Sequence, residues 1–273
     1  MSTYAFPPGC LPDLSDDPAK AGAVFTEAYA FIPGSTMRDI VASLLPGWDK
    51  TRAWIIARPM SGFAETFAQY AVEVQPGGGS DAPEPDDGAQ AGIFIAKGVA
   101  LLSIDGRRHD LRAGSYAYVP PGVAWTIRNQ SDMALQFHWI RKRYTPAPGL
   151  KVPDPIISHD DDAPFHYMPG TDKWATQRFA DPADLRHDMH INIVTFQPGG
   201  RIPFAETHIM EHGLYVLEGS AEYLLNKDWV RVGPGDFMWL RAFCPQACIA
   251  TGDGPFRYLL YKDVNRHPDL VLK

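Results

Sequence analysis

Short apolar runs interrupted by turn residues recur along the whole chain, and they predict an all-β protein. The runs are rich in Val, Ile, Tyr, Phe and Trp, and Gly and Pro separate them. The 24 glycines and 25 prolines are spread along the chain and are not gathered in one tract. This spacing is typical of many short strands joined by turns, and it favours a sandwich or barrel architecture.

Two stretches of the chain carry the same pattern at a constant separation. Asp105-Gly106 is a tight-turn signal between two apolar runs, and the polar segment 226–228 occupies the corresponding place further on. A constant shift over about half of the chain indicates two copies of one β unit. Three pairs of glycines show this shift of 121 residues: Gly79 and Gly200, Gly98 and Gly219, and Gly114 and Gly235.

The repeat divides the chain into four parts. The segment between the two units is rich in Pro and Asp, which is typical of a linker. A short helix is expected around Met37–Leu45, after Ser35-Thr36. The expected parts are an N-terminal arm (1–50), a first β unit (51–145), a linker (146–188) and a second β unit (189–273).

Charge and composition exclude several classes of partner. The chain has 25 Lys and Arg against 32 Asp and Glu, a net charge of −7, which argues against binding to nucleic acid. No apolar run approaches the roughly 18 residues that span a membrane, and the start of the chain lacks the features of a secretory signal. Three cysteines are too few for a disulfide framework. We therefore expect a cytoplasmic protein without a membrane partner.

Four side chains in the second unit form a candidate metal site: Glu206, His208, His212 and Gln246. Glu206 and His208 are two residues apart, so on a strand both project to one face, and His212 keeps this parity if the strand bends little. Two imidazoles, a carboxylate and an amide oxygen suit an octahedral divalent ion with open positions, first Mn²⁺ and then Fe²⁺ or Zn²⁺. The alternative is two surface histidines beside a coincidental carboxylate.

The spacing of these residues, framed by Gly200 and Gly219, resembles the first cupin motif. That motif usually reads His, His, Glu where this chain reads Glu, His, His, and the second motif usually ends in His where this chain has Gln246. The set is similar to that of one bicupin family, (S)-ureidoglycine aminohydrolase, also called the YlbA or glyoxylate-induced protein family. The strings S-Y-A-Y-V-P-P and R-Y-L-L-Y-K-D-V-N-R also resemble this family. The resemblance implies two tandem cupin barrels, of the double-stranded β-helix or jelly-roll type.

The first unit keeps the glycines of the repeat but not the metal ligands. A shift of 121 residues places Pro85, Asp87, Ala91 and Trp125 at the four ligand positions. None of these side chains except Asp87 is a usual metal ligand. We therefore expect the metal in the second unit only, and a packing or assembly role for the first; a second small-molecule site there is the alternative.

The last strand of the second unit supplies candidates for substrate binding. Tyr258 and Lys262 share one face of F-R-Y-L-L-Y-K-D-V, and an inward lysine is costly to bury without an anion. The family resemblance implies that Tyr223, Tyr258 and Lys262 contact the substrate, and that Lys262 and Tyr258 act in catalysis. Glu206 is then either a pure ligand or also a contact of the leaving amine. The alternatives are core tyrosines and a solvated lysine.

Three further residues flank this candidate site. His190 and Asn192 share one face of M-H-I-N-I-V-T-F and are candidates for lining the pocket, although a hydrogen-bonded core histidine is the alternative for His190. Glu211 has the opposite parity to the ligands, so we expect it to be solvated or to lie behind them.

The resemblance implies a manganese-dependent hydrolase with one Mn²⁺ per chain in the C-terminal cupin. Its reaction would release ammonia from (S)-ureidoglycine, a small anionic ureide, and give (S)-ureidoglycolate in allantoin and purine catabolism. One alternative is a metal-dependent bicupin oxygenase or decarboxylase acting on a small carboxylate. Another is a non-enzymatic module that binds a ureide or similar small molecule. Strand edges in the arm and the first unit favour a homo-oligomer.

Overall fold

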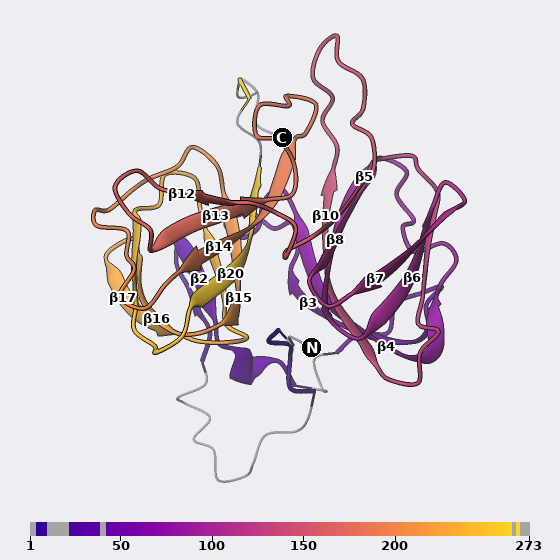
Figure 1. The fold of residues 1–273 in the computed structure, drawn as a ribbon, viewed down its shortest axis with the longest axis horizontal. Coiled ribbons are helices and arrows are strands. Elements are labelled where there is room, and N and C mark those ends of the chain that lie inside the picture. Colours follow the sequence, from indigo (N-terminus) through magenta and orange to yellow (C-terminus); the bar gives the residue numbers. More distant parts are fainter. Residues whose placement is uncertain (1–3, 10–21, 39–41, 264–265, 268–273) are drawn as a thin grey trace.

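The protein folds almost entirely into β-structure, which confirms the expected all-β class. The computed structural model describes residues 4–9, 22–38, 42–263 and 266–267. Within these residues the one helical element is a 3₁₀ turn at Gly34–Thr36, and no helix is long and apolar enough to cross a membrane. The short helix expected around Met37–Leu45 is not formed in the described part of that segment, and residues 39–41 lie outside it. The strands fall into two units that lie side by side (Figure 1).

The first β unit is one curled sheet of nine strands. Their order is β11-β8-β5-β10-β4-β9-β6-β7, and β3 pairs with β4 off this path. The strands are β3 (Asp49–Ala57), β4 (Ala68–Ser80), β5 (Ala89–Lys97), β6 (Val99–Ile104), β7 (Arg107–Arg112), β8 (Ser115–Val119), β9 (Trp125–Arg128), β10 (Leu135–Arg143) and β11 (Ile156–His159).

The second β unit has an eight-stranded and a three-stranded sheet. The first has the order β1-β2-β18-β15-β20-β14-β13-β12, and the second has the order β17-β16-β19. The strands of the larger sheet are β1 (Val24–Phe25), β2 (Tyr29–Ile32), β12 (Phe165–Tyr167), β13 (Trp174–Arg178), β14 (Met189–Phe196), β15 (His212–Glu218), β18 (Phe237–Leu240) and β20 (Phe256–Asp263). Those of the smaller sheet are β16 (Ala221–Leu225), β17 (Asp228–Val232) and β19 (Gln246–Ala250).

The shift of 121 residues seen in the sequence recurs in the structure. Gly98 and Gly219 both follow the strand that leads into a tight connection, and both have a positive φ, at 83° and 75°. A Cβ at Gly98 would lie 2.7 Å from the carbonyl oxygen of Ala134, and one at Gly219 would lie 2.2 Å from that of Pro255. Ala134 and Pro255 are themselves 121 residues apart, so the two units share the same close backbone approach. Only glycine fits this position without strain.

Each unit is completed by a strand from outside its own repeat. β2, from the N-terminal arm, pairs with β18 of the second unit, and β11, from the segment between the units, pairs with β8 of the first. β12 and β13 extend the sheet of the second unit from the same intervening segment. The segment 146–188 thus contributes strands to both sheets.

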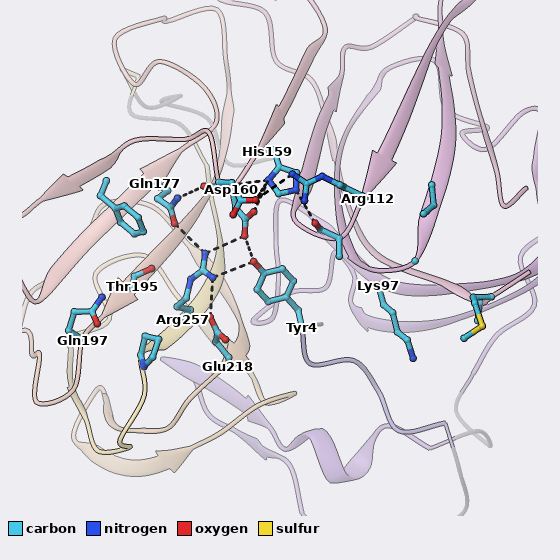
Figure 2. Close-up of a pocket in the computed structure, with 18 residues that line it drawn as sticks. Tyr4, Lys97, Arg112, His159, Asp160, Gln177, Thr195, Gln197, Glu218 and Arg257 are labelled. Atoms are coloured by element: carbon cyan, nitrogen blue, oxygen red, sulfur yellow. Dashed lines mark hydrogen bonds and ion pairs between the residues drawn. The ribbon is translucent and has the colours of Figure 1, made fainter. Parts of the chain in front are cut away.

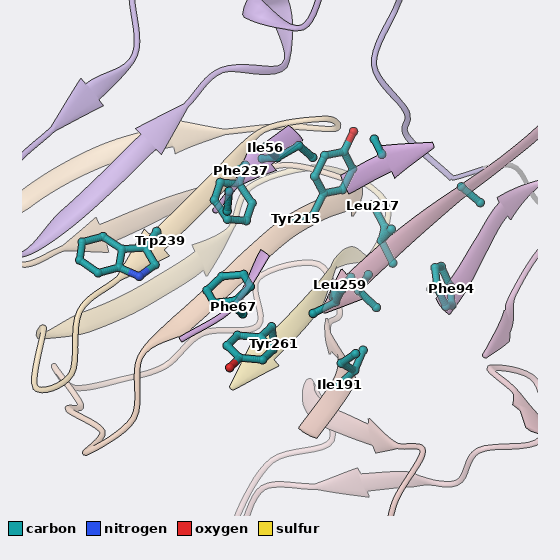
Figure 3. Packing of buried hydrophobic residues seen from close by; sticks show 14 of the residues in the cluster. Ile56, Phe67, Phe94, Ile191, Tyr215, Leu217, Phe237, Trp239, Leu259 and Tyr261 are labelled. Carbon is teal, nitrogen blue, oxygen red and sulfur yellow. The ribbon is translucent and has the colours of Figure 1, made fainter. Parts of the chain in front are cut away.

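A cluster of large apolar side chains joins the two units (Figure 3). Tyr215, Leu259 and Tyr261 of the second unit are almost fully buried in it, as are Phe67 and Phe94 of the first. The rings of Phe67 and Tyr261 stack with centroids 3.9 Å apart. Each unit also has its own inner core, so alternate residues of β14 and β20 face either the barrel interior or the interface between the units.

Candidate metal centre

The four candidate ligands come together at one end of the second unit. The chain that precedes β15 runs alongside β19, with isolated bridges at Arg201–Ile249 and Glu206–Gln246. Glu206 and Gln246 exchange two backbone hydrogen bonds of 2.9 Å each. His212 is the first residue of β15, so it enters the same region from the main sheet.

The side chains of these residues converge as well as their backbones. The Gln246 Nε2 group donates to Glu206 Oε1 at 3.2 Å, and His208 Nε2 lies 3.2 Å from the same oxygen. The rings of His208 and His212 are 4.9 Å apart between centroids. The side chain of His208 is 36% exposed whereas His212 is 4% exposed as a residue, so the group faces solvent on the His208 side.

The chemistry of this donor set fits a divalent cation. Burial, and secondarily the nearby His208 and Lys262, lowers the pKa of His212 to about 3, so its imidazole is neutral and can act as a ligand. Glu206 supplies a carboxylate that has no arginine or lysine partner among the described residues. Nitrogen and oxygen donors of this kind suit Mn²⁺, Fe²⁺ or Zn²⁺. Glu206, His208, His212 and Gln246 are therefore the residues that would hold a metal ion.

Lys262 lies between two histidines on the inner face of the large sheet. Residues directly opposed in an antiparallel pair project to the same face. Lys262 is opposite His212 on β15 and opposite His190 on β14. Burial, then the charge of Lys262, lowers the pKa of His190 to about 4. Lys262 is thus an inward-facing cation beside the candidate ligands, not a solvated surface lysine.

Tyr223 and Tyr258 lie behind the candidate ligands in the inner core of the second unit. The Tyr223 hydroxyl donates a 2.8 Å hydrogen bond to Gln246 Oε1, and the Tyr223 and Tyr258 rings are 6.2 Å apart. Both side chains are buried, and burial raises the pKa of each well above its usual value. Both phenols therefore remain neutral hydrogen-bond donors.

Glu211, next to the candidate ligand His212, is held by hydrogen bonds from both units. One carboxylate oxygen accepts hydrogen bonds from the Glu65 backbone N–H and from Trp239 Nε1, both at 2.9 Å. The other accepts from the backbone N–H and the hydroxyl of Thr66. Glu211 is only 6% exposed, so it is not solvated and lies behind the candidate ligands. A loop of the first unit thereby fixes the start of the strand that carries His212.

The corresponding end of the first unit is filled by apolar side chains. Trp125, which takes the position of Gln246 in the repeat, is buried and packs edge-on against Trp139 with ring centroids 5.7 Å apart. Ala91, at the position of His212, is 2% exposed. This packing agrees with a structural role for the first unit.

A second group of ionisable residues lies between the two units, where His159, Asp160 and Asp161 are close together (Figure 2). They line a cavity of about 750 Å³. His159 Nε2 is 2.9 Å from the Ala113 carbonyl oxygen, and Nδ1 accepts from the Asp161 backbone N–H at 3.1 Å. Both ring nitrogens are therefore occupied in shaping the turn. The Asp160 carboxylate accepts hydrogen bonds from the Tyr4 hydroxyl and from the Arg257 guanidinium. The cluster of His159, Asp160 and Asp161 therefore holds the two units together.

Arg178 is a residue near the site that the sequence did not single out. It is the last residue of β13 and lies opposite Asn192 on the inner face of the sheet. It lies in the segment 146–188, whose Pro- and Asp-rich composition predicts a linker and not a strand. The pattern W-A-T-Q-R, with Trp, Thr and Arg at every second position, was the available signal.

Comparisons with known proteins agree with the observed architecture. The cupin domain family matches the chain twice, over residues 70–141 and 192–261. The structure of a glyoxylate-induced protein from Pseudomonas aeruginosa superposes with a TM-score of 0.92 at 55% sequence identity, and the match covers 100% of both chains. Oxalate decarboxylase from Bacillus subtilis superposes with a TM-score of 0.64 at 13% identity, over 85% of this chain and 77% of that one. This last likeness shows the fold alone.

Two curated relatives are similar over most of their length. A protein of Oryza sativa subsp. japonica, named probable (S)-ureidoglycine aminohydrolase, is 35% identical over 256 residues, which cover 93% of this chain and 79% of the relative. The (S)-ureidoglycine aminohydrolase of Escherichia coli strain K12 is 29% identical over 232 residues, which cover 85% of this chain and 87% of the relative.

Proposed function

Because the chain belongs to the (S)-ureidoglycine aminohydrolase family of bicupins, we propose that it is a manganese-dependent hydrolase that releases ammonia from (S)-ureidoglycine. The comparisons with known proteins confirm two predictions from the sequence, the family resemblance and the two-cupin fold. In the proposed reaction water adds to the α-carbon, the bond from this carbon to the amine nitrogen breaks, and (S)-ureidoglycolate and ammonia form. This reaction belongs to the breakdown of allantoin and purines.

The convergence of Glu206, His208, His212 and Gln246 is the observation that supports this proposal most strongly. The Glu206 carboxylate lies 3.2 Å from both the Gln246 amide nitrogen and His208 Nε2, although Gln246 is 40 residues further along the chain. A bound Mn²⁺ would supply a positive centre with open coordination positions at which a small ureide is oriented and polarised.

The residues of the chain around this position suit an anionic substrate. Lys262 projects into the barrel beside His212, so its ammonium group can hold the substrate carboxylate. Tyr258 and Tyr223 present neutral hydroxyl groups from the inner core, which can donate hydrogen bonds and guide protons. The nearby Glu206 carboxylate can accept a hydrogen bond from the protonated amine, which leaves as ammonia. Holding the α-carbon among these groups supplies much of the rate enhancement through orientation.

Burial gives the proposed site a low-dielectric wall on one side. Tyr223 is fully buried, and Tyr258 and His212 are each 4% exposed. Electrostatic interactions are stronger in such an environment than in water. The more exposed His208 lies on the solvent side, which is where a substrate can enter.

The experiment is an ammonia-release assay on freshly prepared (S)-ureidoglycine with metal analysis of the same samples. The protein is depleted of metal and reloaded with Mn²⁺, Fe²⁺ or Zn²⁺, and His208→Ala is compared with His166→Ala, a matched change at an exposed histidine on β12. We expect about one metal ion per chain, strongest activity with Mn²⁺, and loss of both metal and activity in His208→Ala only. Full activity in metal-free protein contradicts the proposal.

Oxygen consumption is measured in the same samples, because a bicupin oxygenase is the main competing function. Ureide-dependent uptake of oxygen without ammonia release supports the competing function and overturns the proposed hydrolysis. Binding of ureides without any turnover supports a non-enzymatic binding module instead.

A further inference from the structure

Two polar side chains beside the candidate metal centre, Arg178 and Asn192, have no part in the proposed site so far. Arg178 on β13 is directly opposite Asn192 on β14. In the neighbouring row His190 is opposite Lys262, which is opposite the ligand His212. Directly opposed residues share a face, so both rows project to the same side of the sheet.

This face looks into the second barrel. Val194, two residues after Asn192 on β14, belongs to the inner core of that barrel, whereas Ile193 between them belongs to the cluster that joins the units. Trp174 and Arg178 project to the same face of β13, and Trp174 packs against the same inner core. Arg178 and Asn192 therefore lie on the face that carries Lys262 and His212.

Arg178 and Lys262 are two partly buried cations that no carboxylate of the described residues offsets. The charge of Arg178 acts on Lys262 and, after the larger effect of burial, lowers the pKa of its ammonium group. Two other partly buried cations are paired with carboxylates: Lys142 lies 2.5 Å from Asp188, and Arg141 forms an ion pair with Glu84. Two adjacent cations in such a place are unfavourable unless an anion completes the group.

Asn192 adds a second unsatisfied group on the same face. Its residue is only 2% exposed, and its side-chain oxygen Oδ1 is buried without a hydrogen-bond partner in the described residues. Leaving a buried amide oxygen without a donor costs free energy, because its lost hydrogen bonds to water are not replaced, so such groups usually have a partner. A ligand that carries N–H groups beside a carboxylate would satisfy Asn192 and the two cations together.

We infer that Arg178 and Lys262 together clamp the carboxylate of an α-ureido acid, and that Asn192 Oδ1 accepts a hydrogen bond from its ureido N–H groups. This inference rests on the proposed function and specifies how the site selects its substrate class. The guanidinium fork of Arg178 matches a planar carboxylate in a way that a lysine does not. Neutral ureides lack the anion, and simple carboxylates lack the N–H donors, so both should bind less tightly.

The test measures binding separately from turnover. The probes are N-carbamoylglycine, which has the ureido and carboxylate groups but lacks the leaving amine, and its neutral amide. Their affinities for manganese-loaded protein are measured by calorimetry. The variants are Arg178→Gln, Arg178→Lys and Asn192→Leu, with Arg231→Gln on the exposed part of β17 as the matched control. Thermal unfolding of each variant is recorded. If Arg178→Gln fails to fold, Arg178→Lys, which keeps the positive charge, takes its place in the comparison.

For wild type we expect tighter binding of N-carbamoylglycine than of the amide. Arg178→Gln should lower the affinity for the carboxylate probe about tenfold or more and change that for the amide by less than about threefold, and Arg178→Lys should restore part of the loss. Asn192→Leu should weaken both probes by a similar factor of about ten, because both carry the ureido group. The KM for ureidoglycine should rise in Arg178→Gln more than kcat falls.

Two outcomes overturn the inference while leaving the proposed function intact. In one, Arg178→Gln keeps the wild-type preference for the carboxylate probe. In the other, Asn192→Leu binds both probes as wild type does. If wild-type protein neither binds the carboxylate probe nor releases ammonia from ureidoglycine, the proposed function fails together with the inference.

Discussion

Glu206 and Gln246 are joined by two backbone hydrogen bonds of 2.9 Å, and their side chains approach each other to 3.2 Å. This bridge ties the irregular chain before β15 to the first residue of β19. The backbone bonds do not depend on the side chains. Substitutions at either residue can therefore change the metal donors while the local chain path is kept.

Replacement of Gln246 by leucine should abolish metal binding without unfolding the protein. The change removes one oxygen donor and the acceptor of the Tyr223 hydroxyl. We expect the affinity for Mn²⁺ to fall by more than about 100-fold, since even the loss of outer hydrogen-bond partners typically costs about 10–100-fold. Titration calorimetry with metal-depleted protein measures the effect. Gln197→Leu, at an exposed glutamine after β14, is the control and should bind Mn²⁺ normally.

Glu211→Gln should destabilise the protein and weaken metal binding together. The glutamine side chain offers N–H groups where the structure needs acceptors for Thr66 and Trp239. We expect a loss of about 2–3 kcal/mol in the free energy of unfolding, and about a tenfold loss of Mn²⁺ affinity as His212 shifts. Denaturant unfolding of metal-free protein and metal titration separate the two effects. Equal stability of Glu211→Gln and the control Glu222→Gln, on β16, would show that the network carries no stability.

Gly219→Ala should destabilise the second unit more than backbone strain alone explains. The new Cβ would lie 2.2 Å from the Pro255 carbonyl oxygen, and φ is 75°. Gly122 has nearly the same φ, 73°, with nothing within 4 Å of its Cβ position. Gly122→Ala should therefore cost about 1 kcal/mol, and Gly219→Ala about 3 kcal/mol or more. Similar losses in the two variants would mean that the backbone relaxes without cost at Gly219.

Acid should destabilise the protein partly through His138. This residue is fully buried against Tyr215, with ring centroids 4.2 Å apart, and burial lowers its pKa from 6.5 to about 3. The unfolded chain then binds more protons than the folded one, so stability is complete above pH 6.5 and falls as the pH drops towards 3. One such histidine contributes a slope of up to about 1.4 kcal/mol per pH unit.

The variant His138→Phe isolates this contribution. It keeps an aromatic ring beside Tyr215 and removes the titrating group. The free energy of unfolding of this variant should depend less steeply on pH between about 4 and 6 than that of wild type, although His190 and His212 still contribute. Urea unfolding at a series of pH values gives both slopes. An unchanged slope means that His138 is already protonated in the folded protein.

Lys262→Met should make the free protein more stable and the enzyme inactive. The methionine fills similar space and removes a partly buried charge that has no carboxylate partner among the described residues. A gain of about 1 kcal/mol in the free energy of unfolding is expected, as is common where a site is strained for function. Affinity for N-carbamoylglycine should fall at least about tenfold. Loss of stability together with retained binding is the opposite pattern and contradicts an anion-binding role for Lys262.

Local spacing was sufficient to predict the fold and the side chains at the candidate site. Glycines 121 residues apart mark the two units because a close backbone approach requires glycine at each. The cupin spacing correctly predicts that Glu206, His208 and His212 lie together. The strand parity expected for Glu206 and His208 is wrong, because the chain before His212 is irregular apart from an isolated bridge at Glu206. Their role as metal ligands stays a prediction, as do the boundaries of the four parts and the expected homo-oligomer.

Long-range contacts could not be predicted from the sequence. Nothing in the apolar run 29–32 indicates that it pairs with β18 of the second unit rather than with the nearer first unit. The bonds from Thr66 to Glu211 join residues 145 apart, and no pattern in either segment signals them. Arg178 could not be predicted for another reason: the segment 146–188 has the Pro- and Asp-rich composition of a linker, yet it contains the strands β11, β12 and β13.

The pairing of β2 with β18 has a consequence for biosynthesis. About 200 residues separate these strands, so at about 5–20 residues per second β2 leaves the ribosome roughly 10–40 seconds before its partner. During this interval one edge of the apolar segment Y-A-F-I, which pairs with β1 along its other edge, lacks its strand partner. The second barrel can close only after β18 has been translated, and termination before β18 leaves the edge of β2 exposed to pairing with another chain.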